Sequence, residues 1–182
     1  MVMKRMITAL ISLLVLSVLA AGCVYASETQ SAGAGPDTDL TYLFERGTYE
    51  KKDISLNEVE RIAILFTSSP LPQSLLLDME DMKSYYDPGR DIYYNISVSK
   101  YINDLSDNER SQIEQIWHKA DFNNWDFYYE GFSEMDYECH FAVETANAVY
   151  HYEIKGVDAP APDSLTDFIT DLLHTFWNPE IS

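Results

Sequence analysis

Cysteine is scarce in this chain, with only two among its 182 residues. Two cysteines are too few for a disulfide scaffold or for a structural zinc site. Basic residues are scarce as well: 12 Lys and Arg stand against 30 Asp and Glu, and the formal net charge is −18. A surface of this charge repels phosphate backbones, so we expect no nucleic acid among the partners.

Several sequence motifs of common catalytic and metal sites are missing. The chain has no G-x-S-x-G, no P-loop and no G-x-G-x-x-G, the motifs of many hydrolases and nucleotide-binding enzymes. Its four histidines occur neither as H-x-x-x-H nor as H-E-x-x-H, and its acidic clusters lack the glycine turn of a calcium-binding loop. We therefore predict no cofactor, no metal site and no enzymatic activity.

The N-terminus carries the features of an export signal. Lys4 and Arg5 precede an apolar run from Met6 to Leu19, and the small residues Ala20-Ala21-Gly22 follow. A basic head, an apolar run of this length and a small-residue cleavage site are typical of a secretory signal peptide. The run is shorter than the roughly 20 apolar residues that a membrane span requires. We expect residues 1–22 to be removed from the mature protein.

Cys23 follows this segment directly. The sequence Leu19-Ala20-Ala21-Gly22-Cys23 resembles the bacterial lipobox, in which the cysteine becomes the lipidated first residue of the mature chain. The resemblance implies a diacylglycerol on Cys23 and a lipid-anchored protein on the extracytoplasmic face of the cell membrane, since two or more acyl chains give stable anchoring. The alternative is an ordinary secretory signal that is cleaved after Ala26.

A linker and a single domain are expected after the anchor. Residues 27–39 read SETQSAGAGPDTD, a small and polar composition that is typical of a flexible linker. We assign residues 23–39 to the lipidated cysteine and this linker, and residues 40–182 to one domain. Removing residues 1–22 takes away two basic residues and no acid. The remaining body is repelled by anionic lipid headgroups, and its anchoring therefore requires the lipid.

Capping signals and periodicity predict two helices. Ser106 and Glu109 form a capping box, and the apolar residues that follow recur at helical spacing as far as Ala120. A second helix is expected to begin at Asp163 or Ser164 and to carry a complete apolar stripe over residues 165–176. A short helix over residues 40–44, capped by Asp37 or Thr38, is expected before them.

Strands are expected in most of the remaining sequence. Apolar runs rich in β-branched or aromatic residues predict strands over 60–66, 75–79 and 92–98, and a hairpin over 137–143 and 148–154. The order of strands, helix, hairpin and helix predicts an α+β fold, in which two amphipathic helices pack on one face of an antiparallel sheet.

Residues 106–176 resemble uncharacterised small bacterial lipoproteins of the Firmicutes type in the order of their elements. In that family a capped helix precedes a Trp/Tyr segment, a strand pair, a glycine, a proline-bearing loop and a C-terminal amphipathic helix. The residues at the corresponding places are Trp125, Tyr129, Gly156 and Pro160 or Pro162. An Asp-Gly turn with a following Trp is usual in the family, whereas this chain has Gly131-Phe132-Ser133. The resemblance implies a similar layout, and the family has no established activity to carry over.

Cys139 and the histidines are the candidate groups for nucleophilic or metal chemistry. Adjacent residues of a strand point to opposite faces, so Cys139 and His140 cannot act on each other as nucleophile and base. We expect Cys139 to be a buried core residue that forms no disulfide. His140 and His151 lie on the two arms of the expected hairpin, where a cross-strand polar pair is favoured over a metal site.

Aromatic residues are abundant, with 13 Tyr and three Trp. Outward-pointing rings offer a large and rigid contact area, and we interpret Tyr93, Trp125, Tyr128 and Tyr129 as a candidate binding face. The sequence favours a non-catalytic binding module whose partner is an envelope protein or peptide with a basic face. The alternative is a small cell-envelope hydrolase that uses an acidic pair or Cys139.

Overall fold

The computed structural model describes residues 39–45, 53–67, 73–132 and 137–176. All of them belong to one compact unit, Ala34–Ser182. The expected signal peptide, the lipidation site Cys23 and the linker up to residue 38 lie outside the described residues. Within the described ranges, no helix is long and apolar enough to cross a membrane.

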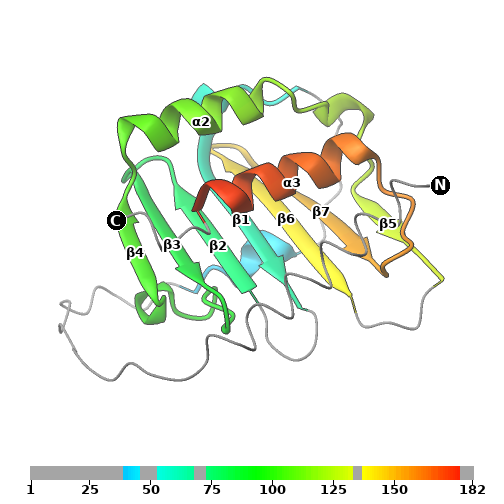
Figure 1. The fold of residues 1–182 in the computed structure, drawn as a ribbon, viewed down its shortest axis with the longest axis horizontal. Helices are drawn as coiled ribbons and strands as arrows, with labels where there is room; N and C mark the ends of the chain where they lie inside the picture. The colour runs from blue at the N-terminus through cyan, green and yellow to red at the C-terminus, as the bar shows by residue number, and fades with distance from the viewer. Residues whose placement is uncertain (1–38, 46–52, 68–72, 133–136, 177–182) are drawn as a thin grey trace. The chain divides into compact units, whose positions relative to one another are not determined.

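A seven-stranded sheet with the order β4-β3-β2-β1-β6-β7-β5 forms the centre of the domain (Figure 1). All neighbouring strands are antiparallel except β5 and β7, which run parallel. The predicted α+β class is confirmed, with one parallel pair at the edge. The strands are β1 (Val59–Phe66), β2 (Gln73–Asp78), β3 (Lys83–Asp87), β4 (Tyr101–Asp104), β5 (Tyr128–Glu130), β6 (Glu138–Thr145) and β7 (Ala148–Lys155).

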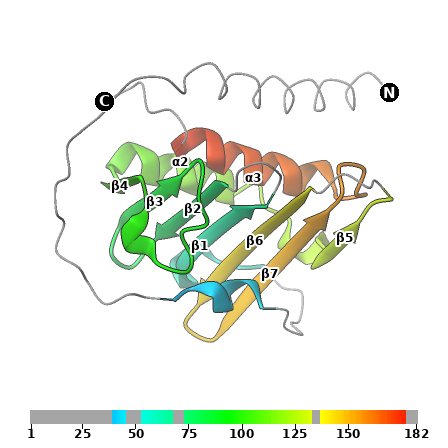
Figure 2. The ribbon, with the colours of Figure 1, turned by 90° about the horizontal axis from the view of Figure 1, so that it is seen from below.

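Two helices, α2 (Asp107–Trp117) and α3 (Asp163–Phe176), cover one face of the sheet (Figures 1 and 2). The predicted capping box is present: Ser106 Oγ accepts from the amide of Glu109, and Glu109 Oε2 accepts from the amide of Ser106 at 2.8 Å. Both apolar stripes are buried against the sheet. Their buried members are Ile113, Ile116 and Trp117 in α2, and Leu165, Phe168, Ile169, Leu172 and Leu173 in α3.

Shorter segments pack on the opposite face of the sheet. The 3-10 helix η1 (Thr41–Phe44) lies below β6 and β7 in Figure 2, and the connection from β3 to β4 contains a second one, η3 (Ile96–Val98). They form a smaller core on this face, which the sequence did not predict. Its buried members are Leu40, Leu43, Ala63, Leu65, Leu76, Ile92, Tyr93 and Ala142.

The expected strand over residues 92–98 is wrong, and this segment consists of turns and η3. The Asp91 carboxylate accepts from the amide of Tyr93 at 2.9 Å, and the Asn95 side chain accepts from the amide of Ser97 at 2.9 Å. Such side-chain acceptors satisfy the backbone locally and compete with pairing in a sheet. The alternation of aromatic and polar residues was therefore not evidence of a strand.

Three short strands and the first short helix also differ from the elements expected from the sequence. Strands β3, β4 and β5 were not predicted, and two of them have only three or four residues, too few to show a period. The short helix at residues 40–44 is the 3-10 helix η1, and the amide of its first residue, Thr41, donates to Asp39 Oδ1 at 2.9 Å. The caps proposed from the sequence, Asp37 and Thr38, lie outside the described residues.

Candidate functional site

The structure does not bring the four candidate aromatic residues together on one surface. Tyr93 and Trp125 are 0% exposed and Tyr129 is 8% exposed, whereas Tyr128 is 39% exposed. The expectation of an outward aromatic face is therefore wrong for three of the four residues. Tyr128, on the edge strand β5, is the member that a partner could touch.

Hydrogen bonds explain why these polar rings are inside. Tyr93 inserts between β1 and β2, where its hydroxyl accepts from the amide of Ile64 at 3.0 Å and donates to the carbonyl of Leu75. Burial raises the pKa of Tyr93 well above its usual value, and the phenol stays protonated. The Tyr129 hydroxyl accepts from the amide of Asp126 at 2.6 Å. A buried phenol whose hydroxyl is hydrogen-bonded in this way stabilises the core and is not available to a partner.

Cys139 has the environment of a structural residue. It lies in β6 with 1% exposure, and it belongs to the core beneath the helices. Burial raises the pKa of its thiol far above the usual range, so that little of the nucleophilic thiolate exists at neutral pH. Its predicted burial is confirmed. The thiol is free, and Cys23 lies outside the described residues.

His140 and His151 form the expected cross-strand pair. His140 Nδ1 and His151 Nε2 are 3.0 Å apart, and the two rings are stacked. The ring of Phe44 in η1 contacts both imidazoles, which links this short segment to the β6–β7 hairpin. Glu138 Oε1 lies 3.9 Å from His140 Nε2. In the described part of the chain, no group of three His, Cys, Asp or Glu side chains is arranged to hold a metal ion.

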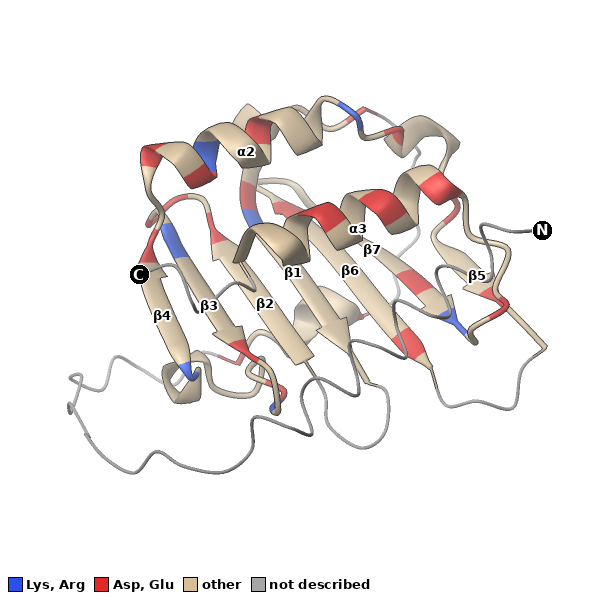
Figure 3. Cartoon of the chain, viewed as in Figure 1, with Lys and Arg blue, Asp and Glu red and all other residues tan. Residues whose placement is uncertain are grey.

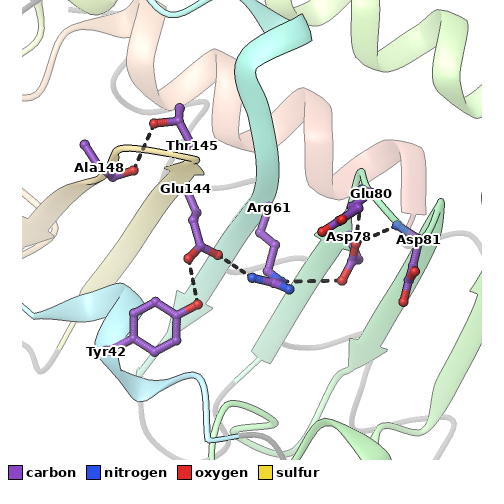
Figure 4. A network of polar contacts seen from close by, with 8 residues as sticks. All are labelled: Tyr42, Arg61, Asp78, Glu80, Asp81, Glu144, Thr145 and Ala148. Carbon is purple, nitrogen blue, oxygen red and sulfur yellow. Dashed lines mark hydrogen bonds and ion pairs between the residues drawn. The ribbon is translucent and has the colours of Figure 1, made fainter.

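Two carboxylates on the same face of the sheet share one guanidinium (Figure 4). Arg61 Nη1 donates to Glu144 Oε2 at 2.7 Å, and Arg61 Nε lies 3.4 Å from Asp78 Oδ2. The Tyr42 hydroxyl donates to the other oxygen of Glu144 at 2.8 Å. Although partial burial acts in the opposite direction, Glu144 and Asp78 raise the pKa of Arg61. This acidic pair holds β6, β1, β2 and η1 together.

One short motif that also occurs in catalytic sites was not recognised from the sequence. Ser97 and Lys100 have the S-x-x-K spacing in which a lysine can assist a serine nucleophile. Here the Ser97 hydroxyl donates to Asn95 Oδ1 at 2.6 Å, and Lys100 Nζ lies over the ring of Tyr101, 5.2 Å from its centroid. The two side chains are thus engaged with different neighbours.

A column of acids marks the solvent side of α3. Asp163, Asp167 and Asp171 follow one another at intervals of four residues, and Figure 3 shows acidic positions along α2 and α3. Asp163 and Asp167 are exposed, and the side chain of Asp171 is 44% exposed. Lys119 Nζ lies 3.4 Å from Asp171 Oδ2. From the sequence, Asp163 was a candidate cap and Asp167 an acid favoured by the dipole in the first turns, although the spacing of four could have revealed the whole column.

No protein-family model matches the chain, and neither the curated proteins nor the solved structures contain a match. The fold and the surface define an α+β domain whose helical layer is acidic on its outer side. Its cysteine, its paired histidines and most of its candidate aromatic residues stabilise the fold. The surface charge is the feature on which a function can be argued.

Proposed function

We propose that this chain is a lipid-anchored, non-catalytic binding module on the extracytoplasmic face of the cell membrane. Its partner is an envelope protein or peptide with a basic face, and it docks against the outer side of α3. The observation that carries this proposal is the column of Asp163, Asp167 and Asp171 on one side of a single helix.

Repulsion within the column destabilises α3 in the isolated domain. Like charges at i and i+4 destabilise a helix by about 0.2–0.5 kcal/mol per pair, and α3 contains two such pairs in succession. Asp163, in the first turn, gains from the helix dipole, and Asp171 has Lys119 Nζ at 3.4 Å, but neither effect removes the repulsion that Asp167 receives from both sides. Lysine or arginine side chains of a partner would relieve the repulsion along the whole column.

The charge of the whole chain supports the same kind of partner. A net charge of −18 attracts a basic face over a distance and accelerates its association, and this effect weakens as the salt concentration rises. The lipid on Cys23 and the polar linker keep the domain at the membrane, while its charge repels it from anionic headgroups. Tyr128, being partly exposed, is a second contact that a partner could use.

The test compares two variants with the same change in net charge. Asp163→Asn, Asp167→Asn and Asp171→Asn neutralise the column, and Glu45→Gln, Asp53→Asn and Asp81→Asn neutralise three other exposed acids. The full-length proteins are cross-linked in native membranes, and the captured partners are identified and quantified. We expect the wild type and the second variant to capture the same partner, and the column variant to capture several-fold less of it.

Two results would contradict the proposal. Equal capture by all three proteins would show that the column does not contact the partner, and an equal loss in both variants would show that only the net charge matters. Turnover of an envelope substrate, abolished by replacing one carboxylate or Cys139, would favour the hydrolase instead.

A further inference from the structure

Strand β4 ends the sheet with an open edge. In the described ranges, β3 is the neighbour of β4 on one side, and no strand pairs with the other. Three of its four residues, Ile102, Asn103 and Asp104, are exposed, and the isoleucine is 44% exposed. Natural proteins commonly cover or charge such an edge, because its unpaired backbone groups can bind another strand.

The backbone pattern shows which residues face this edge. In an antiparallel ladder, alternate residues direct both their N–H and C=O groups to the same neighbouring strand. The amide of Leu105 donates to the carbonyl of Met82, the residue before β3, at 2.8 Å. Tyr101 and Asn103 are in phase with Leu105 and therefore also bond towards β3. The backbone groups of Ile102 and Asp104 consequently point to the open edge.

We propose that the β4 edges of two copies of this chain pair antiparallel about a two-fold axis through Ile102. In this register Ile102 lies opposite Ile102 of the second copy. Lys100 lies opposite Asp104 of the second copy, and the symmetry repeats this pair on the other side of the axis. The edge is thus complementary to itself in charge, although the molecule as a whole is strongly acidic.

Side-chain direction supports this register. Residues two apart in a strand share a face, so Ile102 and Asp104 project from the same side of the sheet. Lys100 immediately precedes β4, and its ammonium, which lies 5.2 Å from the centroid of the Tyr101 ring in one copy, would turn to Asp104 of the second copy in the dimer. An apolar contact at the axis would therefore be flanked by an ion pair on each side. Other registers with the same backbone phase shift one strand by two residues, which shortens the overlap and places Ile102 opposite a charged residue.

The short edge sets the strength of the pairing. A seam of five residues buries less than the roughly 1,000 Å² that a stable interface requires, so the dimer is weak in dilute solution. Confinement on a membrane raises the effective concentration of the two copies. The experiment described next, disulfide cross-linking, therefore uses the full-length chain in membranes. Wild-type protein is the control for any disulfide that Cys23 or Cys139 forms.

A single cysteine at the axis tests the register. Opposed residues of a hydrogen-bonded antiparallel pair have Cα atoms about 5.5 Å apart, within the range of roughly 4.4–6.8 Å for a disulfide. Ile102→Cys should therefore form a disulfide-linked dimer on mild oxidation. Asn103→Cys, an exposed position on the same strand, should not, because Asn103 lies opposite Tyr101 of the second copy.

The outcomes of this comparison are distinct. Absence of an Ile102→Cys dimer in membranes would overturn the proposal, and equal dimers from both variants would show a parallel or non-specific contact. Cross-linking of Ile102→Cys to a different protein would show that a foreign strand occupies the edge. Neutralising the α3 column should leave the Ile102→Cys dimer unchanged, which separates this proposal from the proposed function.

Charge exchange gives an independent test in the Ile102→Cys background. Lys100→Asp or Asp104→Lys alone places like charges opposite each other on both sides of the axis. Each cross-strand pair contributes about 0.2–1 kcal/mol, so the loss of both pairs should weaken the dimer roughly 2- to 30-fold. A mixture of the two variants should restore it, because every opposed pair is then of opposite charge. General repulsion predicts instead that Asp104→Lys, which lowers the net negative charge, strengthens the dimer.

Asp104 also lies opposite Lys83 of β3 within one copy, so Asp104→Lys places two like charges within the fold. Asp104→Asn removes the charge alone and serves as the second variant, with a smaller expected loss than Asp104→Lys. Circular dichroism of each variant establishes that it is folded. Folded variants whose mixture fails to restore the dimer would overturn the proposed register.

Discussion

The indole Nε1 of Trp125 donates to Ser164 Oγ at 2.9 Å and ties the segment before β5 to the first turn of α3. Trp125 is fully buried, so Ser164→Ala would leave its N–H without this acceptor. We expect Ser164→Ala to lower the free energy of unfolding by about 1–3 kcal/mol. Chemical denaturation measures this loss. In the Trp125→Phe background the loss from Ser164→Ala should nearly vanish, and an unchanged loss would show that the hydrogen bond is not its cause.

Leu172 is a fully buried member of the α3 stripe. Leu172→Ala removes apolar volume from the layer between helix and sheet, and such changes typically cost about 2–5 kcal/mol. We expect a loss of this size in the free energy of unfolding. Thr170→Ala, at an exposed position on the same helix, is the matched control and should change it little. Equal stabilities of the two variants would contradict the packing of α3 on the sheet.

The burial of Cys139 predicts slow thiol chemistry. Burial raises the pKa of this thiol and also blocks reagents, so thiol labelling of the folded protein at neutral pH should be slow. It should accelerate once denaturant unfolds the domain. The measurement uses Cys23→Ala, which retains Cys139 as its single cysteine. Rapid stoichiometric labelling of the folded protein would indicate an accessible thiolate and would reopen the hydrolase alternative.

Tyr42 predicts a change of stability in alkaline solution. Partial burial, together with the hydrogen bond to Glu144 and its charge, raises the pKa of Tyr42 from 10.0 to about 12. Because folding favours the protonated phenol, its contribution to stability is complete below pH 10 and is lost as the pH rises through about 12. Tyr42→Phe should lack this component of the pH dependence.

The difference in phenolate absorbance between wild type and Tyr42→Phe follows this titration directly. Ionisation of Tyr42 near pH 10 in the folded protein would contradict both its partial burial and its contact with Glu144. Glu144→Gln keeps the shape of the acceptor and removes its charge, so it should lower the pKa of Tyr42 from about 12 towards its usual value.

The proposed lipidation of Cys23 predicts how the protein partitions between membrane and soluble fractions. Cys23→Ala removes the only residue that the lipobox resemblance provides for the acyl chains, so the variant should appear as soluble or uncleaved protein. Fractionation together with labelling by a fatty-acid analogue measures this outcome. Unchanged partitioning of Cys23→Ala, with no label lost, would contradict the lipid anchor.

Local signals in the sequence were sufficient to predict the two helices and the β6–β7 hairpin. The capping box at Ser106 and Glu109 lies within one helical turn, and the stripe on α3 depends only on the helical period. The pair of His140 and His151 followed from their places on two adjoining strands. Contacts of this kind depend on short sequence separations, which periodicity and turn residues specify.

The tertiary structure alone decided which aromatic rings became part of the core. Tyr93 alternates with polar neighbours like a residue on a half-exposed strand, yet it hydrogen-bonds to Ile64 and Leu75, which are far away in the chain. Strands β3, β4 and β5 are short, and each is stabilised by pairing with a neighbouring strand and not by its own sequence pattern.

The acidic charge, the two amphipathic helices and the burial of Cys139 could all be predicted from the sequence. The ion pairs of Arg61 with Asp78 and Glu144, and the place of β4 at the edge of the described sheet, became known only from the tertiary structure. The physical reason is that charge, helical period and apolar character are properties of local sequence. Strand order and ion pairs depend instead on which distant segments meet when the core closes.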